Sequence, residues 1–280
     1  MVTIAACQEL HQDWLKSLAG ATGGRTFSTH ESEWVWLPAR RQLVLLYPQR
    51  IAPAGIRPGL AEGMRLGAQS VSVWLNNAVS YAPLEAFGFR RGPQPMWMSA
   101  PVSAPMQYSA APAAVDPEPA EVSGPDAEEL AAGRGHPRTG WHVTTRSEGT
   151  LTGRAWVFVP SQQAQQEQRR LREEAEQRRQ RDRTAAAADR PAAGRAAPEE
   201  PPARRKPASG SLGGVFGLAV GPSSRRRGYG TALLSRAAAV AAAAGADRLA
   251  VNAAPLGAEL CAARGFELIG RGQQLTLDLR

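Results

Sequence analysis

The chain has 280 residues, 43% of them hydrophobic, and a formal net charge of +8. This length fits one large domain or two ordinary ones, and no apolar run is long enough to predict a transmembrane helix. The N-terminus lacks the charged start and apolar core of a signal peptide. Two cysteines and four histidines without close spacing predict neither a disulfide framework nor a metal site. We therefore expect a soluble, cytoplasmic protein that has no membrane partner and binds no metal.

The positive charge is carried almost entirely by arginine, since only two of the 33 basic residues are lysine. Such a balance suits an anionic partner, either a small molecule with phosphate groups or a nucleic acid. The net charge alone does not distinguish these two partners.

Residues 1 to about 100 have the pattern of a first folded domain. Short runs of apolar residues predict strands and helices in alternation. The predicted elements are strands at Trp34–Leu37 and Leu43–Leu46, a helix at Leu60–Leu66, a strand at Ser70–Trp74, a helix at Pro83–Phe87 and a last strand at Met96–Met98.

The middle of the chain combines a linker, a hairpin and an insertion. Residues 101–125 are rich in Pro and Ala and predict a linker, after which Asp126 fits the start of a helix and of a second domain, 126–280. Residues 140–160 predict a β-hairpin with its turn near Gly149. Residues 161–212 are polar and of low complexity, which predicts a disordered insertion in a surface loop.

Order is expected to return near Gly213. The predicted elements are a strand at Val215–Val220, an alanine-rich helix at Gly230–Ala244, a strand at Arg248–Val251, a helix at Leu256–Ala263 and a strand at 275–279.

The segment that joins the strand at Val215–Val220 to the helix has the composition of a phosphate site. The first turn of a helix has backbone N–H groups without internal partners, and the helix dipole adds positive charge there, so anions bind at this end. Gly228 and Gly230 have no Cβ and allow a ligand to approach the main chain. Arg225, Arg226 and Arg227 add positive charge and hydrogen-bond donors. These features predict a site for a diphosphate.

The motif is neither the nucleotide P-loop nor the dinucleotide fingerprint, because neither spacing is present. Instead Val220, Arg225, Gly228 and Gly230 form a valine followed by R-x-x-G-x-G, ahead of a helix. Downstream come a strand, a helix and Gly265-Phe266. This arrangement resembles the acetyl-coenzyme A motif of the GNAT N-acetyltransferase superfamily, over residues 213–280 and the preceding hairpin.

The resemblance implies a fold, a cofactor and a reaction. The fold is α/β, with a mixed, mostly antiparallel sheet flanked by helices. The co-substrate is acetyl-CoA, whose thioester enters where two strands splay apart, and the partner is an amine that attacks the acetyl carbonyl directly. The residues expected to bind acetyl-CoA are Leu218, Ala219, Val220, Arg225, Arg226, Arg227, Gly228, Tyr229, Gly230 and Thr231.

The resemblance leaves the catalytic acid and base open. Many members have a tyrosine four residues before the Gly-Phe, where this chain has Cys261. A thiol could donate a proton to the departing thiolate, but cysteine is also a common buried packing residue, and packing is favoured. His142 and Glu148 on the hairpin are candidates for a base, although each also fits a strand end or turn, and a water chain would serve as well.

The N-terminal segment repeats the same plan without its loop. Residues 64–92 and 241–270 both give Gly-Ala, a strand, an Asn, a short helix and Gly-Phe. No R-x-x-G-x-G precedes the first copy, and Leu84 stands at the tyrosine position. We therefore expect two GNAT-type units, the first of which has lost its cofactor loop; the alternative is chance similarity between two α/β segments.

Three functions follow in order of preference. The first is an acetyl-CoA-dependent N-acetyltransferase that acts on a small-molecule or protein amine. The second is a non-catalytic acyl-CoA-binding or sensor protein, favoured by the missing tyrosine and base. The third is nucleic-acid binding through the insertion, which ranks last because residues 161–212 also carry acidic residues and offer no aromatic residues for stacking.

Overall fold

The computed structural model describes residues 1–76, 79–108, 140–160, 170, 177 and 211–279. Contacts group Met1–Val159 and Gly210–Arg280 into one compact unit and Pro160–Ser209 into another. Only three residues of the second unit are described, so the fold below is that of the first. The predicted linker, the helix start at Asp126 and most of the predicted insertion lie outside the described residues.

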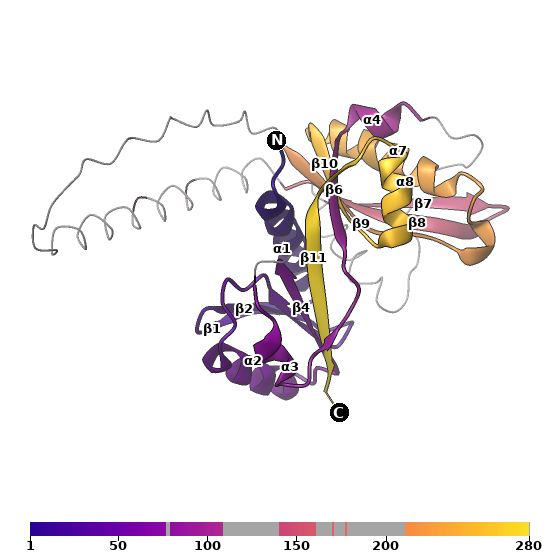
Figure 1. Ribbon diagram of the computed structural model, residues 1–280. Coiled ribbons are helices and arrows are strands. Elements are labelled where there is room, and N and C mark those ends of the chain that lie inside the picture. The colour runs from indigo at the N-terminus through magenta and orange to yellow at the C-terminus, as the bar shows by residue number, and fades with distance from the viewer. Residues whose placement is uncertain (77–78, 109–139, 161–169, 171–176, 178–210, 280) are drawn as a thin grey trace, which may run out of the picture. The chain divides into compact units, whose positions relative to one another are not determined.

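The described residues form helices and one eleven-stranded mixed sheet (Figure 1). The elements are α1 Ile4–Ala21, β1 Arg25–Thr29, β2 Ser32–Leu37, β3 Gln42–Leu46, α2 Pro53–Arg65, β4 Ser70–Asn76, α3 Ala82–Glu85, β5 Arg90–Arg91, β6 Met96–Pro101, α4 Ser103–Met106, β7 Gly140–Ser147, β8 Thr150–Phe158, β9 Leu212–Val220, the 3₁₀ turn η1 Pro222–Ser224, α7 Tyr229–Ala243, β10 Arg248–Ala253, α8 Pro255–Ala262 and β11 Glu267–Asp278.

The strand order is β1-β2-β3-β4-β11-β6-β10-β9-β8-β7, and β5 pairs with β11 at the side. Among the described strands only two pairs, β3 with β4 and β9 with β10, are parallel. In each pair a helix connects the two strands, as parallel pairing requires. The predicted mixed, mostly antiparallel α/β sheet flanked by helices is thus confirmed.

The first half of the chain is buried on both faces of its sheet. Along β2, Trp34 packs with residues of α2 while Val35 and Leu37 pack with residues of α1. A Cβ at Gly59 of α2 would lie 2.2 Å from the Trp34 ring, so this glycine lets the helix approach the tryptophan. Burial on both faces explains why β2 and β3 read as continuous apolar runs.

The two halves exchange strands. Strand β6, from the first half, pairs with β10 and β11 of the second. Strand β11, at the end of the chain, pairs with β6 over its first residues and with β4 from Gly272 to Asp278. The expected strands at Met96–Met98 and 275–279 are confirmed, but each has neighbours from the opposite half. The predicted domain boundaries at residues 100 and 126 stay a prediction.

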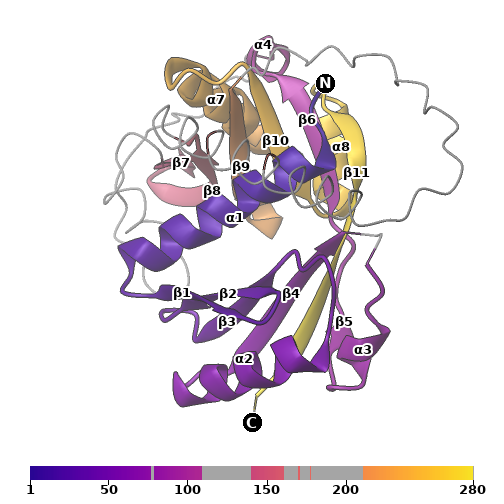
Figure 2. The same ribbon diagram turned by 90° about the vertical axis from the view of Figure 1, so that its left-hand side faces the viewer.

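Helix α1 lies against strands of both halves (Figure 2). Thr3 caps it, since its Oγ1 accepts a hydrogen bond of 3.2 Å from the Ala6 N–H. One buried cluster unites α1 with residues of β2, β3, β6, β8, β9 and β10. This helix was not predicted, and it holds the core between the two ends of the sheet.

His11 of α1 is the polar centre of that cluster. Its Nδ1 lies 2.8 Å from the Tyr47 hydroxyl, and its ring is 4.8 Å from the Trp74 ring and 5.4 Å from the Phe216 ring. Burial, with a smaller effect from the Arg40 charge, lowers the pKa of His11 to about 3. The imidazole is therefore neutral at physiological pH and is satisfied by Tyr47.

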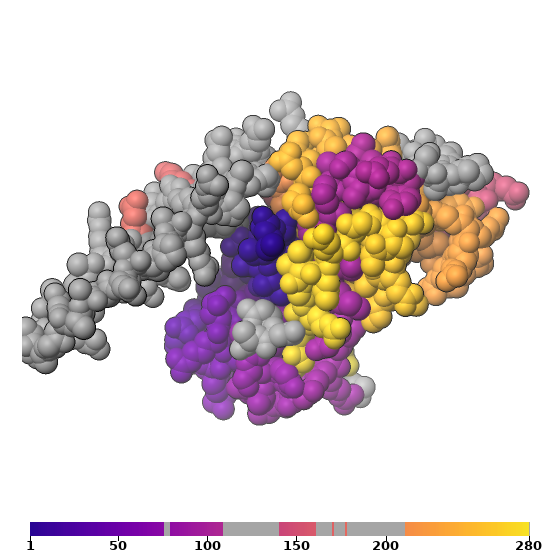
Figure 3. Space-filling model, turned by 45° about the horizontal axis from the view of Figure 1, so that its top comes forward, coloured from indigo at the N-terminus to yellow at the C-terminus, as the bar shows by residue number. Residues whose placement is uncertain are grey.

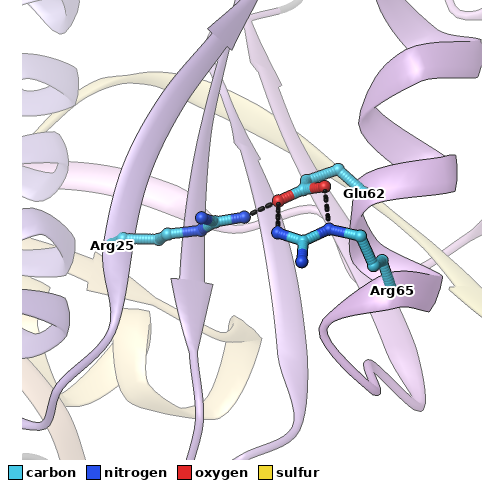
Figure 4. A network of polar contacts seen from close by, with 3 residues as sticks. All are labelled: Arg25, Glu62 and Arg65. Carbon is cyan, nitrogen blue, oxygen red and sulfur yellow. Dashed lines mark hydrogen bonds and ion pairs between the residues drawn. The ribbon is translucent and has the colours of Figure 1, made fainter.

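A polar network ties the edge strand β1 to α2 (Figure 4). Glu62 accepts two hydrogen bonds of 2.7 Å from Arg65, one turn further along the helix. The same carboxylate forms an ion pair with Arg25 of β1. These groups are partly exposed, so we expect a contribution of no more than about 1 kcal/mol per pair.

Within the described part of the chain, no helix is both long and apolar enough to cross a membrane. No group of three or more His, Cys, Asp or Glu residues that could hold a metal ion is found among the same residues.

The low pKa of His11 predicts a loss of stability in acid. An unfolded histidine titrates near pH 6.5, so the unfolded chain binds a proton at His11 between pH 6.5 and about 3 that the folded chain excludes. Stability should therefore be full above pH 6.5 and fall as the pH approaches 3, by on the order of 3 kcal/mol from this residue between pH 7 and pH 4.

Denaturant unfolding at several pH values measures this effect on the wild type and on His11→Gln. The variant should be less stable at neutral pH but should lose less stability on acidification, because glutamine does not titrate. Equal losses in the two proteins between pH 7 and pH 4 would show that His11 does not cause the pH dependence.

Candidate functional site

The arginine loop lies between the end of β9 and the start of α7. The turn η1 leads into Arg225, and the chain then takes positive φ angles at Arg226 (63°) and Gly228 (88°). A Cβ at Gly228 would meet no atom within 4 Å, so the loop faces open space at this residue. Glycine is suited to Gly228 because of its backbone angle rather than because of crowding.

Helix α7 begins without a side-chain cap. Gly228 is the N-cap residue and has no side chain that could accept a hydrogen bond. The first hydrogen bond of the helix runs from the Ala232 N–H to the Gly228 carbonyl, at 3.0 Å. The N–H groups of residues 229–231 have no partner within the helix, as at any helix start. An uncapped first turn beside three arginines has the polarity of an anion site.

The three arginines of the loop are exposed. Arg225 Nε donates to the Val220 carbonyl at 3.3 Å, and the Arg227 guanidinium lies 5.8 Å from the Tyr229 ring centre. None of the three forms an ion pair with a carboxylate of the described residues. Their charge is therefore available to an anionic ligand.

Gly230 also has a packing role that the sequence analysis did not predict. A Cβ at this position would lie 2.7 Å from Leu260 Cδ2, so the glycine lets the first turn of α7 approach α8. Crowding at Gly230 is thus internal to the protein, whereas the open face of the loop is at Gly228.

Strands β9 and β10 diverge beside this loop. Their parallel pairing runs from Leu212 opposite Arg248 to Val215 opposite Val251 and stops there. The remainder of β9, Phe216–Val220, pairs with β8 only among the described strands. The segment that contains Leu218, Ala219 and Val220 therefore has backbone groups on its β10 side that no strand uses.

A β-bulge accompanies the divergence. Trp156 of β8 pairs with Phe216, and Arg154 pairs with Ala219, so two residues of β9 stand where β8 has one. The bulge contains Gly217, whose φ of 58° favours glycine. A bulge bends its strand, which is consistent with β9 turning away from β10 at this point.

The equivalent strands of the first half stay together. The parallel pairing of β3 with β4 extends over all of β3, from Gln42 opposite Ser70 to Leu46 opposite Trp74. The Tyr47 N–H continues it with a bond of 3.0 Å to the Trp74 carbonyl. The β-α-β unit thus occurs in both halves, but the strands diverge only in the second.

Cys261 is a residue of α8 whose side chain lies in the core. Its side chain is 3% exposed and belongs to the apolar cluster that also contains Leu233, Ala237 and Phe266. Burial raises the pKa of the Cys261 thiol to about 12. The thiol is therefore protonated at neutral pH and surrounded by apolar side chains.

The two candidate bases lie in different environments. His142 is buried on β7 and stacks on Trp156 at 3.8 Å, and burial, helped by the Arg146 charge, lowers the pKa of His142 to about 4. Neither ring nitrogen has a hydrogen-bond partner among the described residues. Glu148 is an exposed residue of the hairpin turn, with a φ of 52°. Of these two residues, only His142 lies on a strand of the sheet. Its strand β7 is separated from the bulged strand β9 by β8.

A contact missed by sequence reasoning joins α8 to the loop. Arg264, which follows α8, donates from Nε to the Thr231 Oγ1 at 3.1 Å. In the sequence the only signal is a basic residue immediately before Gly265-Phe266. Arg264 lies next to Thr231 only because of the way in which α7 and α8 pack, and the sequence does not show this packing.

Comparison with solved structures supports the fold. A GCN5-related N-acetyltransferase from Kribbella flavida has a TM-score of 0.57 and 13% identity, and the match covers 100% of this chain and 97% of that chain. A GCN5-related N-acetyltransferase-like protein from Streptococcus suis gives 0.52 and 12%, with 98% of both chains covered. A functionally unknown conserved protein from Staphylococcus epidermidis gives 0.53 and 9%, with 92% and 96% covered. At these identities the likeness concerns the fold.

Sequence comparison identifies a family for part of the chain. No curated protein matches the chain. Residues 160–266 match the model of the acetyltransferase (GNAT) family, a range that includes the diverging strand β9, the arginine loop, α7 and α8. The chain therefore contains a domain of the GNAT acetyltransferase family, and its sheet has the fold of GCN5-related N-acetyltransferases.

Proposed function

We propose that this protein is an N-acetyltransferase that moves the acetyl group of acetyl-CoA to a primary amine of a small molecule or a protein. The observation that carries the proposal is the divergence of β9 from β10 directly before an uncapped helix and an arginine-rich loop. In this part of the chain a free strand edge and cationic side chains without ion pairs among the described residues adjoin one another.

The two features suit the two ends of acetyl-CoA. The backbone of Leu218, Ala219 and Val220, unpaired on its β10 side, suits the amides of the pantetheine arm as an added strand would. The first turn of α7 suits the diphosphate, with Gly228, Tyr229, Gly230 and Thr231 supplying N–H groups and Arg225, Arg226 and Arg227 supplying charge.

The reaction needs few groups from the protein. The amine nitrogen attacks the acetyl carbonyl carbon, the carbon–sulfur bond breaks and the coenzyme leaves as a thiolate. The attacking nitrogen gives up a proton to a base or to water, and the thiolate takes up a proton. Holding both reactants in the gap between β9 and β10 supplies most of the acceleration, because it converts the encounter into an intramolecular step.

Neither Cys261 nor His142 has the features of an efficient proton-transfer group. The Cys261 thiol is buried and has a pKa of about 12, so we propose that it packs α8 against the core. His142 has a pKa of about 4 and is a weak base for an ammonium group. We therefore propose that water carries the protons.

The first half is proposed to be a second GNAT-type unit that binds no cofactor. It has the same parallel β-α-β unit, formed by β3, α2 and β4. The full pairing of its strands leaves no free edge for pantetheine, and its connection to α2 lacks the R-x-x-G-x-G spacing.

A non-catalytic acyl-CoA-binding or sensor protein is the second candidate. It is favoured by the buried thiol at Cys261 and by the absence of Asp, Glu and His from residues 212–220 of β9. A release assay for free thiol, run with acetyl-CoA and a panel of primary amines, separates the two functions. If acetyl-CoA binds but none of the amines in the panel causes release of free thiol, the sensor function would be favoured.

Gly228→Asp should abolish or strongly weaken the binding of acetyl-CoA. The new side chain points into the open face of the loop, where its negative charge would oppose the diphosphate. Calorimetric titration of acetyl-CoA should show a loss of affinity of at least about tenfold, which corresponds to about 1.4 kcal/mol.

Gly228→Asn is the matched control. Asparagine has nearly the same size and tolerates a positive φ equally well, but has no charge. We expect it to bind acetyl-CoA more tightly than Gly228→Asp, with both variants folded by circular dichroism. Equal affinities for the two variants would argue against a phosphate at this loop, and no binding by the wild type would argue against the proposed function itself.

Cys261→Ala should change stability rather than catalysis. Removing a buried sulfur leaves a small cavity that costs on the order of 1 kcal/mol, whereas kcat with the best amine of the panel should stay within about threefold of the wild type because water supplies the proton.

Cys7→Ala is the control, since Cys7 is also fully buried, has a pKa of about 12 and lies in a different core cluster. The two variants should show similar falls in melting temperature and similar kcat. A loss of kcat of about 100-fold or more in Cys261→Ala alone would instead assign the thiol as the acid.

A further inference from the structure

Arg264 is held beside the first turn of α7 by three neighbours. Its Nε donates to Thr231 Oγ1 at 3.1 Å, its Nη1 donates to the Ala263 carbonyl at 2.8 Å, and its guanidinium lies 4.5 Å from the centre of the Tyr108 ring. Tyr108 follows α4, in the connection that leaves the first half of the chain. The guanidinium is thus fixed by residues from two other segments and by the backbone of the preceding residue.

Close packing of α4 brings these segments together. Gly265, directly after Arg264, has a φ of 85°, and a Cβ there would lie 2.9 Å from Ala104 Cβ. Helix α4 also contacts α7. In Figure 3 the magenta segment that contains α4 lies on the surface directly beside the yellow C-terminal segment.

The charge of Arg264 has no neutralising carboxylate in the described part of the chain. Among the described residues no carboxylate forms an ion pair with it, in contrast to Arg25, Arg65 and Arg91, which all pair with glutamates. An arginine loses considerable side-chain entropy when it is held in one orientation. A fixed and unpaired guanidinium is therefore prepared for an anion from outside.

The position of Arg264 indicates which anion it would meet. Its partner Thr231 is in the first turn of α7, where the N–H groups of residues 229–231 have no partner within the helix. The three loop arginines are exposed and lack such fixed contacts to side-chain oxygens, whereas the Arg264 fork is oriented by Thr231 before any ligand arrives.

We propose, on the basis of the proposed function, that Arg264 binds the diphosphate of the coenzyme and sets its position on α7. The Tyr108 ring supports the guanidinium from one side, and Thr231 fixes its rotation. Arg264 then acts with the loop arginines, but supplies oriented donors where they supply mobile charge.

Calorimetric titration tests the proposal with two probes, acetyl-CoA and its 3′-dephospho form. Arg264→Met keeps an unbranched apolar side chain and removes the guanidinium fork. It should weaken the binding of both probes by about 10- to 30-fold, the effect of losing a charge-assisted hydrogen bond. Arg264→Lys keeps a charge without the fork and should give an intermediate loss. Arg236→Met, at an exposed arginine of α7, is the control and should bind both probes as the wild type does.

Each outcome bears on a different claim. Equal losses for the two probes in Arg264→Met support the assignment to the diphosphate. A loss confined to acetyl-CoA would overturn it, because Arg264 would then bind the 3′-phosphate, and wild-type affinity in Arg264→Met would also overturn it. Failure of the wild type to bind acetyl-CoA would refute the proposed function, and this inference with it. If Arg264→Met does not fold by circular dichroism, the ratio between Arg264→Lys and the wild type decides in the same way.

Discussion

The end of the hydrogen bonding between β9 and β10 at Val215 and Val251 is the constraint on which the candidate site depends. Up to this point the two strands are an ordinary parallel pair, connected by α7 as such pairs must be. Beyond it, the bulge at Gly217 turns β9 away, and five residues keep a free edge. Because the same strand runs directly into the arginine loop, a strand edge and an anion site become neighbours along one continuous backbone.

The first half shows what the same β-α-β unit does without that divergence. There β3 pairs with β4 along its whole length, and Trp34 on the neighbouring strand β2 fills the space against Gly59 of α2. The unit is closed and apolar, as a stable parallel pair normally is. At the candidate site, the bulge of β9 and the arginine loop distinguish the second β-α-β unit from the first.

Local patterns in the sequence were sufficient to predict most strands and helices, the β-hairpin at 140–160 and the loop between β9 and α7. Each of these depends on neighbouring residues, such as the glycines at the loop and the apolar run of β9. The exchange of β6 and β11 could not be predicted, because strand pairing over long separations leaves no local signal. The contacts of Arg264 and the packing reason for Gly230 were missed for the same reason: both depend on how α7, α8 and α4 meet. Helix α1 had a signal, with Thr3 as cap and apolar residues Leu10, Trp14 and Leu18 at helical spacing, that was overlooked.

The strand exchange gives the first half a physical role even without a cofactor. One edge of β10 is free where β9 diverges, so its other edge must be held firmly, and the strand that pairs there is β6 from the first half. An open edge on both sides would leave β10 prone to pairing with other chains. Strand β11 in turn completes the sheet of the first half beside β4. Neither half can therefore be removed without exposing a strand edge of the other.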